Sequence, residues 1–167
     1  MRSRMLAAAL LLLPTLALGQ QPNFGGTWVR DSAKSDPVPN TMYWLTRGVE
    51  ASGERGRNTQ LVLEIQQAGG KIEITDPARP LRTLWLDGKP HRVPTDTGVE
   101  TATVTSTMQG DTLTVSTTQP FGGMPGNATL TIVETWSVSP DGKVLTVKTT
   151  RELPAQRQMF TELFTRK

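Results

Sequence analysis

Apolar residues alternate with polar ones along short runs of this chain, and turn residues separate the runs. Period-two alternation over four to eight residues is typical of β-strands with one buried face. Threonine often fills the alternate positions, as suits a β-branched residue on the wet face of a sheet. The alternating apolar positions are Leu61, Leu63, Ile65, Ile72, Ile74, Leu113, Val115, Leu130, Ile132, Trp136 and Val138.

Tight-turn sequences lie between these runs and predict hairpins. They are Gly69-Gly70, Asp87-Gly88, Gly110-Asp111 and Ser139-Pro140-Asp141-Gly142. The last of them fits a type I turn with proline second and glycine in the left-handed position. Because strands joined by such turns are antiparallel, a parallel sheet is excluded.

The pattern predicts nine strands, with boundaries uncertain by about 2 to 4 residues. An open meander of that size has two exposed edges, which closure into a barrel removes. We therefore expect an all-β fold: an up-and-down antiparallel barrel of about 8 to 10 strands. A two-sheet sandwich is the alternative. The predicted strands are 24–30, 61–67, 70–76, 81–87, 99–109, 112–119, 128–139, 143–153 and 157–166.

The first 19 residues have the features of a secretory signal peptide. Arg2 and Arg4 precede an apolar run from Leu6 to Leu18, and small residues stand three and one positions before the predicted cut, at Ala17 and Gly19. Cleavage after Gly19 predicts an exported chain, periplasmic or extracellular, with one domain over 20–167. The apolar run is shorter than the roughly 20 residues that span a bilayer, so no stable membrane insertion is expected.

The charge of the predicted mature chain argues against nucleic-acid binding. Loss of Arg2 and Arg4 changes 18 basic and 15 acidic residues to 16 and 15, and no basic stripe remains. The chain has no cysteine, so it forms no disulfide. A single domain of this length buries enough surface to fold without disulfides. We expect the chain to be a monomer.

Two connections are long, and function is expected there because binding residues are common on loops. Residues 31–58 follow the first strand and are predicted to form a lid over a barrel mouth, with Tyr43 and Trp44 covering a ligand. Residues 120–127 form a Gly- and Pro-rich tip that carries Phe121 and Met124. These two side chains contact a ligand or partner, or else fold back on the core.

The stretch Asn23 to Trp28, NFGGTW, places two glycines before a large indole, which indicates close backbone approach at that spot. With Phe24, the Gly26-Thr27-Trp28 sequence resembles the Gly-x-Trp signature of lipocalins and fatty-acid-binding proteins. More narrowly, FGGTWVRDSAKSD, LDG, GDTLTV and ETWSVSPDGKVLTV resemble segments of exported, lipocalin-like bacterial proteins of unassigned function. In the superfamily an arginine of the last strand packs over this tryptophan, which implies that role for Arg166, with Arg151 as a substitute.

Charged residues on apolar strand positions are the other candidates for a site. Glu134 shares the parity of Ile132 and Trp136, so its side chain is predicted to be buried and to need a cation. Lys148, Arg151 and Arg157 are the partners considered. Because a one-residue slip of the hairpin at Ser139 to Gly142 reverses the facing of Arg151, sequence leaves the partner open. Trp85 faces either the cavity or solvent, whereas Trp28 and Trp136 are assigned to the core.

The sequence shows no coupled catalytic set. His91 is the sole histidine, between Pro90 and Arg92, which excludes a His-rich metal site. No cofactor or metal is expected. We predict a non-catalytic barrel that binds a small, mostly apolar ligand, with an envelope protein-binding module or inhibitor with a filled interior as the alternative. An enzyme built around Glu134 or His91, a hydrolase or isomerase, is a third hypothesis.

Overall fold

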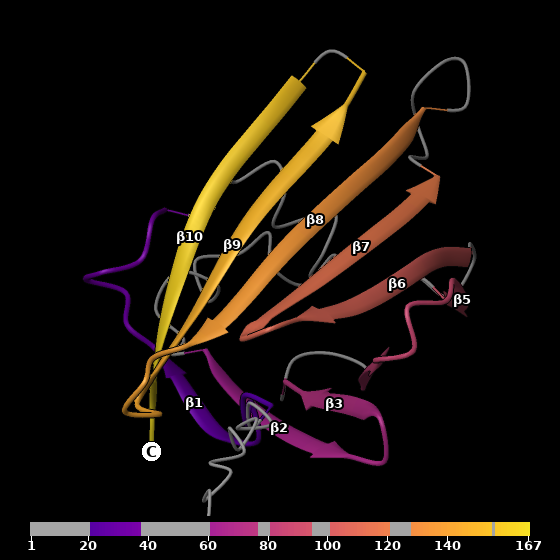
Figure 1. The fold of residues 1–167 in the computed structure, drawn as a ribbon. Helices are drawn as coiled ribbons and strands as arrows, with labels where there is room; N and C mark the ends of the chain where they lie inside the picture. Colours follow the sequence, from indigo (N-terminus) through magenta and orange to yellow (C-terminus); the bar gives the residue numbers. More distant parts are fainter. Residues whose placement is uncertain (1–20, 38–60, 77–80, 95–100, 121–127, 155) are drawn as a thin grey trace, which may run out of the picture.

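The computed structural model describes residues 21–37, 61–76, 81–94, 101–120, 128–154 and 156–167, and these segments form strands and no helix (Figure 1). The five shorter strands are β1 (Gly26–Arg30), β2 (Val62–Ala68), β3 (Lys71–Thr75), β4 (Arg82–Trp85) and β5 (His91–Pro94). The five longer strands are β6 (Thr101–Gln109), β7 (Thr112–Pro120), β8 (Thr129–Val138), β9 (Val144–Leu153) and β10 (Gln156–Arg166).

All ten strands belong to one antiparallel sheet, in the order β4-β3-β2-β1-β10-β9-β8-β7-β6-β5. Strands that are consecutive in the sequence pair with each other, except β4 and β5. The first strand, β1, pairs with the last strand, β10, as well as with β2. The first and last strands of this order, β4 and β5, do not pair, and the place where they meet is called the seam here. The turn after β4 bridges the seam, because Gly88 N donates a hydrogen bond to Ser106 O of β6 at 3.1 Å. The sheet is a nearly closed barrel, as the sequence predicts.

One strand was missed by the sequence pattern. The structure has ten strands rather than nine, and β5 is the extra one. No residue of β5 is fully buried. Val93 packs against the core, but one apolar residue makes no alternating run, so the strand is recognised by its pairing with β6. The strand expected at 81–87 is also shorter, because the turn at Leu86 begins earlier than the pattern indicates.

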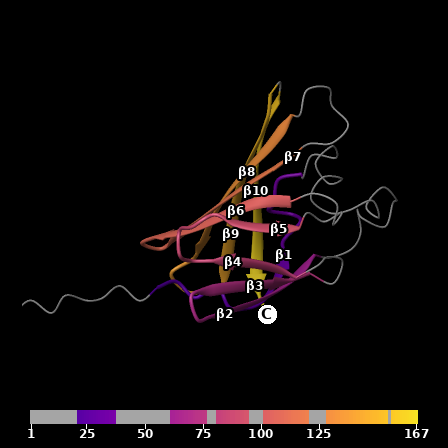
Figure 2. The same ribbon diagram turned by 90° about the vertical axis from the view of Figure 1, so that its right-hand side faces the viewer.

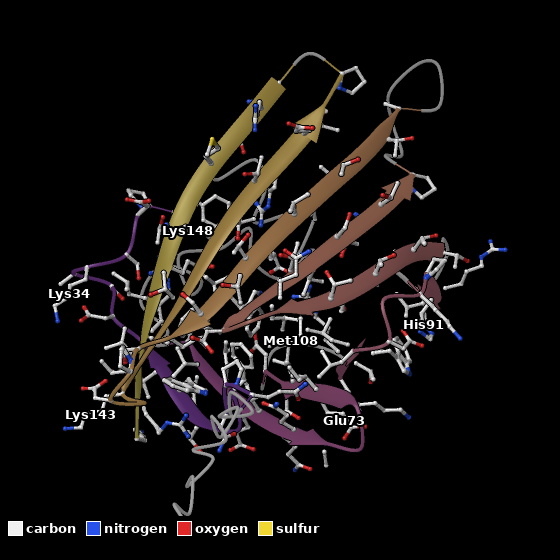
Figure 3. The ribbon with its side chains drawn as sticks, viewed as in Figure 1. Lys34, Glu73, His91, Met108, Lys143 and Lys148 are labelled. Atoms are coloured by element: carbon white, nitrogen blue, oxygen red, sulfur yellow. The ribbon has the colours of Figure 1, made fainter. Side chains whose placement is uncertain are left out.

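The apolar core fills the lower part of the barrel, where the two halves of the sheet face each other. Figure 2 shows β2–β6 crossing in front of β7–β10, and Figure 3 shows Met108 directed into the space between these layers. Lys34 and Lys143 lie at the periphery. The buried members of the core are Phe24, Trp28, Leu63, Ile65, Ile72, Ile74, Leu84, Val104, Leu113, Val115, Trp136, Leu145, Val147 and Phe164.

Trp28 closes the base of the barrel, as the family resemblance implies. Its side chain is fully buried, and its Nε1 donates to Phe24 O at 2.8 Å. The Arg166 guanidinium carbon lies 4.3 Å from the indole centroid, a stacking distance for a cation on an aromatic ring. Arg166 also donates to Gly142 O at 2.7 Å, to Gly25 O at 2.5 Å and to Asn23 O at 3.0 Å, so one side chain ties both chain ends and a hairpin together.

Gly26 is required by this arrangement. Its φ is 130°, and a Cβ there would lie 2.9 Å from Arg166 Nη1. Glycine is the residue that tolerates such a φ and such close approach. The close contact that NFGGTW predicts is therefore the approach of the first strand to the last arginine.

The segment after β1 runs along β10 and continues its edge. Asp31 N and Asp36 N donate to Leu163 O and Thr161 O, each at 2.8 Å. In return, Thr161 N donates to Asp36 Oδ2 at 2.7 Å and Leu163 N to Ser35 Oγ at 2.9 Å. The backbone groups of Thr161 and Leu163 on β10 are thus paired rather than left at a free edge.

The hairpin between β8 and β9 is pinned by two side chains, which settles its register. Ser139 Oγ donates to Asp141 Oδ1 at 2.6 Å, and Lys143 N donates to the same oxygen at 3.1 Å. Gly142 has the expected left-handed φ of 71°. In this register Arg151 is paired with Ile132, on the inner face of the sheet.

Asp141→Asn is expected to reduce the acid sensitivity of the fold. The Ser139 hydroxyl and then the Lys143 N–H hold the pKa of Asp141 below its ordinary value of 3.8. A lowered folded-state pKa stabilises the protein above 3.8, and this contribution is lost as the pH falls below that value. In urea unfolding at a series of pH values, the stability gap between wild type and variant should shrink below pH 3.8. A gap that stays constant there contradicts the role given to the carboxylate.

Candidate binding site inside the barrel

The register of the strands defines which side chains share the inner wall. Cross-strand partners lie on the same face of a sheet. One row runs from β6 to β10 through Ser106, Val115, Glu134, Thr149 and Phe160. Val115 is fully buried and Thr149 is 4% exposed, so this row faces the interior.

The opposite wall carries a second row, from β2 to β4. It contains Ile65, Ile74 and Arg82 in register. Both isoleucines are buried, so Arg82 also projects to the inner side. Arg82 was not among the residues picked out from sequence, although it shares the strand parity of Leu84.

Arg82 and Glu134 form an ion pair that crosses the interior. The Nη1 atom of Arg82 donates to Glu134 Oε1 at 3.2 Å, and its Nη2 atom contacts Oε2. Strands β4 and β8 are far apart in the sheet order, so this contact spans the barrel rather than neighbouring strands. The side chains are 35% and 14% exposed, respectively, so solvent reaches the pair.

The structure gives Glu134 a partner, Arg82, that was not among the cations considered from the sequence. The residue opposite Glu134 on β9 is Thr149, and Lys148 faces the other side, exposed. Arg157 pairs with Glu152 on the outer surface at 3.1 Å, where both side chains are more than half exposed. The prediction that Glu134 faces inward and meets a cation is confirmed, but the cation comes from across the barrel.

A second internal ion pair lies between β1 and β10. Arg30 Nε donates to Glu162 Oε1 at 2.8 Å, with side chains 16% and 11% exposed. Arg30 also donates to Asp36 O at 2.9 Å, which ties the pair to the segment along β10. Neither residue was a sequence candidate. Both share the parity of buried aromatic residues, Trp28 and Phe164, and that signal could have found them.

Arg151 is a buried inner-wall residue, as one of the two possible registers predicts. Its guanidinium carbon lies 4.7 Å from the centroid of the Phe160 ring. It does not replace Arg166 over Trp28. Leu130, Ile132 and Leu153 form a small apolar cluster at the same end of the long strands, separate from the main core.

Three uncharged polar atoms on this wall are buried without a hydrogen-bond partner among the described residues. They are Ser106 Oγ, Trp136 Nε1 and Gln158 Oε1. Ser106 is 1% exposed and Trp136 is 3% exposed. Trp136 lies in the core, as expected, with its ring 6.4 Å from that of Phe24. Buried polar atoms of native proteins are normally hydrogen-bonded, so these three are exceptions to that rule within the described segments.

Trp85 and His91 form a separate cluster at the seam between β4 and β5. Their rings stack with centroids 4.3 Å apart, and His91 Nε2 lies 3.0 Å from Asp87 Oδ1. Backbone donation from Lys89 N, followed by the contact with His91, lowers the pKa of Asp87. Trp85 is half-buried. His91 and Glu134 have different partners and form no acid–base pair.

Four predicted site residues lie outside the described residues: Tyr43, Trp44, Phe121 and Met124. Their roles as lid and tip residues stay predictions, as does the signal peptide at 1–19. Over the described segments, no group of three His, Cys, Asp or Glu side chains is placed to hold a metal ion. The same segments contain no helix long and apolar enough to cross a membrane.

No protein-family model matches the chain, and no curated protein sequence matches it. Solved structures do. Lipid binding protein 8 of Caenorhabditis elegans has a TM-score of 0.59 at 11% identity, over 90% of this chain and 100% of that one. The chain folds as a fatty-acid-binding-protein-like barrel. At such identity the likeness shows the fold alone.

Two further structures show the same fold. The zebrafish ileal bile acid-binding protein, solved with cholic acid, has a TM-score of 0.58 at 19% identity, over 86% of this chain and 98% of that one. An SAHS protein from Ramazzottius varieornatus also has a TM-score of 0.58, at 13% identity, over 89% and 98% of the two chains.

Proposed function

We propose that this chain is an exported, non-catalytic barrel that binds a small, mostly apolar molecule in its interior. The observation that carries the proposal is the Arg82–Glu134 pair. Both residues occupy strand positions whose side chains face the interior, yet the Arg82 side chain is 35% exposed. An inward-facing side chain that solvent reaches is what an incompletely filled interior would give.

The lining below this pair suits an apolar body. Val115 lies beside Glu134, while Ile74 lies beside Arg82, and both are buried. Small-molecule sites in proteins are mostly apolar, with a few polar groups that fix the ligand's orientation. The inner wall has this composition, because it combines a continuous apolar cluster with the Arg82–Glu134 and Arg30–Glu162 pairs.

The solved neighbours support the proposal by analogy. The zebrafish protein binds cholic acid, and the Caenorhabditis elegans protein is a lipid binding protein. Export is proposed from the predicted signal peptide. We propose a non-catalytic chain because the two candidate catalytic residues have separate partners. His91 stacks on Trp85 and contacts Asp87, whereas Glu134 pairs with Arg82.

A screen of lipids and aromatic compounds tests the proposal through two readouts. A ligand that binds the folded chain raises its melting temperature, with the shift growing with ligand concentration. Because Trp28 and Trp136 belong to the buried core of the barrel, a ligand that enters the barrel should change tryptophan fluorescence in a saturable manner. If a broad panel produces neither response, the proposed function is wrong.

A further inference from the structure

The barrel has one junction without a backbone ladder, the seam between β4 and β5. We infer that the barrel opens there, with β4 moving away from β5 and β6, and that the Arg82–Glu134 pair restrains this opening. The open seam is then the route by which an apolar molecule reaches the interior. The opening does not depend on the proposed function, whereas its use as a route rests on it.

The seam is the junction where separation breaks the fewest backbone hydrogen bonds. Neighbouring strands elsewhere in the sheet order are hydrogen-bonded to each other. Across the seam, the described residues provide a single backbone hydrogen bond, from Gly88 N to Ser106 O at 3.1 Å. Segments held by few such contacts open locally at the lowest free energy. The free energy of opening is therefore set mainly by side chains.

Three side chains of β4 hold the strand in place. Leu84 is fully buried in the core. Trp85 stacks on His91 of β5 next to the turn, where the chain itself already joins the two strands. Arg82 stands at the opposite end of β4 and contacts Glu134 of β8. The ion pair thus ties down the end of β4 that lies farthest from the turn.

The ion pair is a tie that can release, because solvent reaches it. Arg82 is the more exposed member of the pair and is only partly covered. Water can therefore solvate its guanidinium group when the pair separates, which reduces the penalty that makes fully buried charges costly to separate. A tie of this kind can break and form again while the core stays folded.

The inner side of the seam is apolar. Leu86 follows β4, Val93 lies on β5 and Met108 lies on β6, and each is partly buried against the core. Figure 3 shows Met108 directed into the space between the two layers of the sheet. Movement of β4 away from β5 would expose apolar side chains that are continuous with the core. An apolar molecule can bind to such a surface on its way inward.

The test of the opening needs no ligand and compares two backbone amides of the full chain by hydrogen exchange, followed by NMR. Gly88 N donates across the seam to Ser106 O, whereas Leu86 N donates to Gly70 O on the β3 side. Opening of the seam exposes the first amide and leaves the second paired. Glu134→Gln should therefore raise the exchange rate of the Gly88 amide about tenfold, and that of Leu86 by less than about twofold. Equal acceleration of both amides, or of neither, would overturn the inference.

Two further variants separate the tie from a general loss of stability. Glu152→Gln makes the same change of charge in the outer pair with Arg157, so it should leave the Gly88 amide unchanged. Trp85→Ala removes the stacking contact across the seam, so it should accelerate exchange at Gly88 even if Glu134→Gln does not fold. A Gly88 amide that responds equally to both glutamine variants, or that keeps its protection in Trp85→Ala, contradicts the inference.

Stopped-flow tryptophan fluorescence with dodecanol tests whether the seam is the route. Because binding that requires a conformational change is slowed by it, the association rate should rise about tenfold in Glu134→Gln and stay unchanged in Glu152→Gln. Equal rates in wild type and Glu134→Gln would show that dodecanol enters elsewhere, such as at the predicted mouth under residues 31–58, and would overturn the route. If no apolar compound binds wild type, the proposed function fails, whereas the amide exchange still decides whether the seam opens.

Discussion

Replacing Trp28 with alanine is expected to lower the free energy of unfolding by about 3–5 kcal/mol. The indole is fully buried and carries the stacked Arg166 guanidinium on its face. Its loss leaves a cavity at the base and removes the hydrogen bond to Phe24 O. Urea denaturation followed by far-ultraviolet circular dichroism measures the change, because that signal reports the sheet and does not depend on the deleted indole.

Trp85→Ala is the matched control for this experiment. Trp85 is half-buried and stacks on His91 at the seam, outside the apolar core. An aromatic pair of this kind contributes about 0.5–1.5 kcal/mol beyond its buried area, so a smaller loss is expected. If the two alanine variants lose the same stability, then the base formed by Trp28 and Arg166 is not the anchor of the barrel.

Glu162→Gln is expected to be the second most damaging change, at about 3 kcal/mol. It leaves Arg30 without its carboxylate at a position where the Arg30 side chain is only 16% exposed. The same substitution at Glu152 breaks the outer pair with Arg157, whose side chains are 51% and 64% exposed. That pair should contribute only about 0–1 kcal/mol, because solvent screens it.

Chemical denaturation of both glutamine variants measures the difference directly. A loss in Glu162→Gln no greater than that in Glu152→Gln would show that the Arg30–Glu162 pair does not stabilise the junction of the first and last strands. Replacing Arg30 and Glu162 together by methionine should recover part of the loss, since an apolar pair leaves no uncompensated charge.

Local patterns predicted most of the fold because each strand and hairpin has its own sequence signal. Alternation located nine strands, and Ser139 to Gly142 indicated the turn that the structure shows. The closure between the chain ends also followed, because Trp28 and Arg166 belong to a recognisable signature. By contrast, β5 has no buried residue and contains Arg92 and Pro94, so nothing in its sequence distinguishes it from a loop.

The binding site was predicted only in part, for a geometric reason. Parity along one strand shows which way Glu134 points, but not which residue of a distant strand it meets. Its partner Arg82 lies across the barrel, at a place set by the number and register of the strands between them. The parity that identified Glu134 also applies to Arg30, Arg82 and Glu162. A search for every charge on an apolar strand face would therefore have found these residues, although not how they pair.

The most direct test of the central claim is to locate a bound ligand. Amide chemical shifts of the isotope-labelled chain, titrated with dodecanol, report which residues the ligand approaches. The account predicts the largest shifts on the inner wall, at Arg82, Ser106, Glu134 and Thr149. Shifts concentrated instead on outward-facing neighbours such as Thr105, Lys148 and Thr150 would contradict binding inside the barrel.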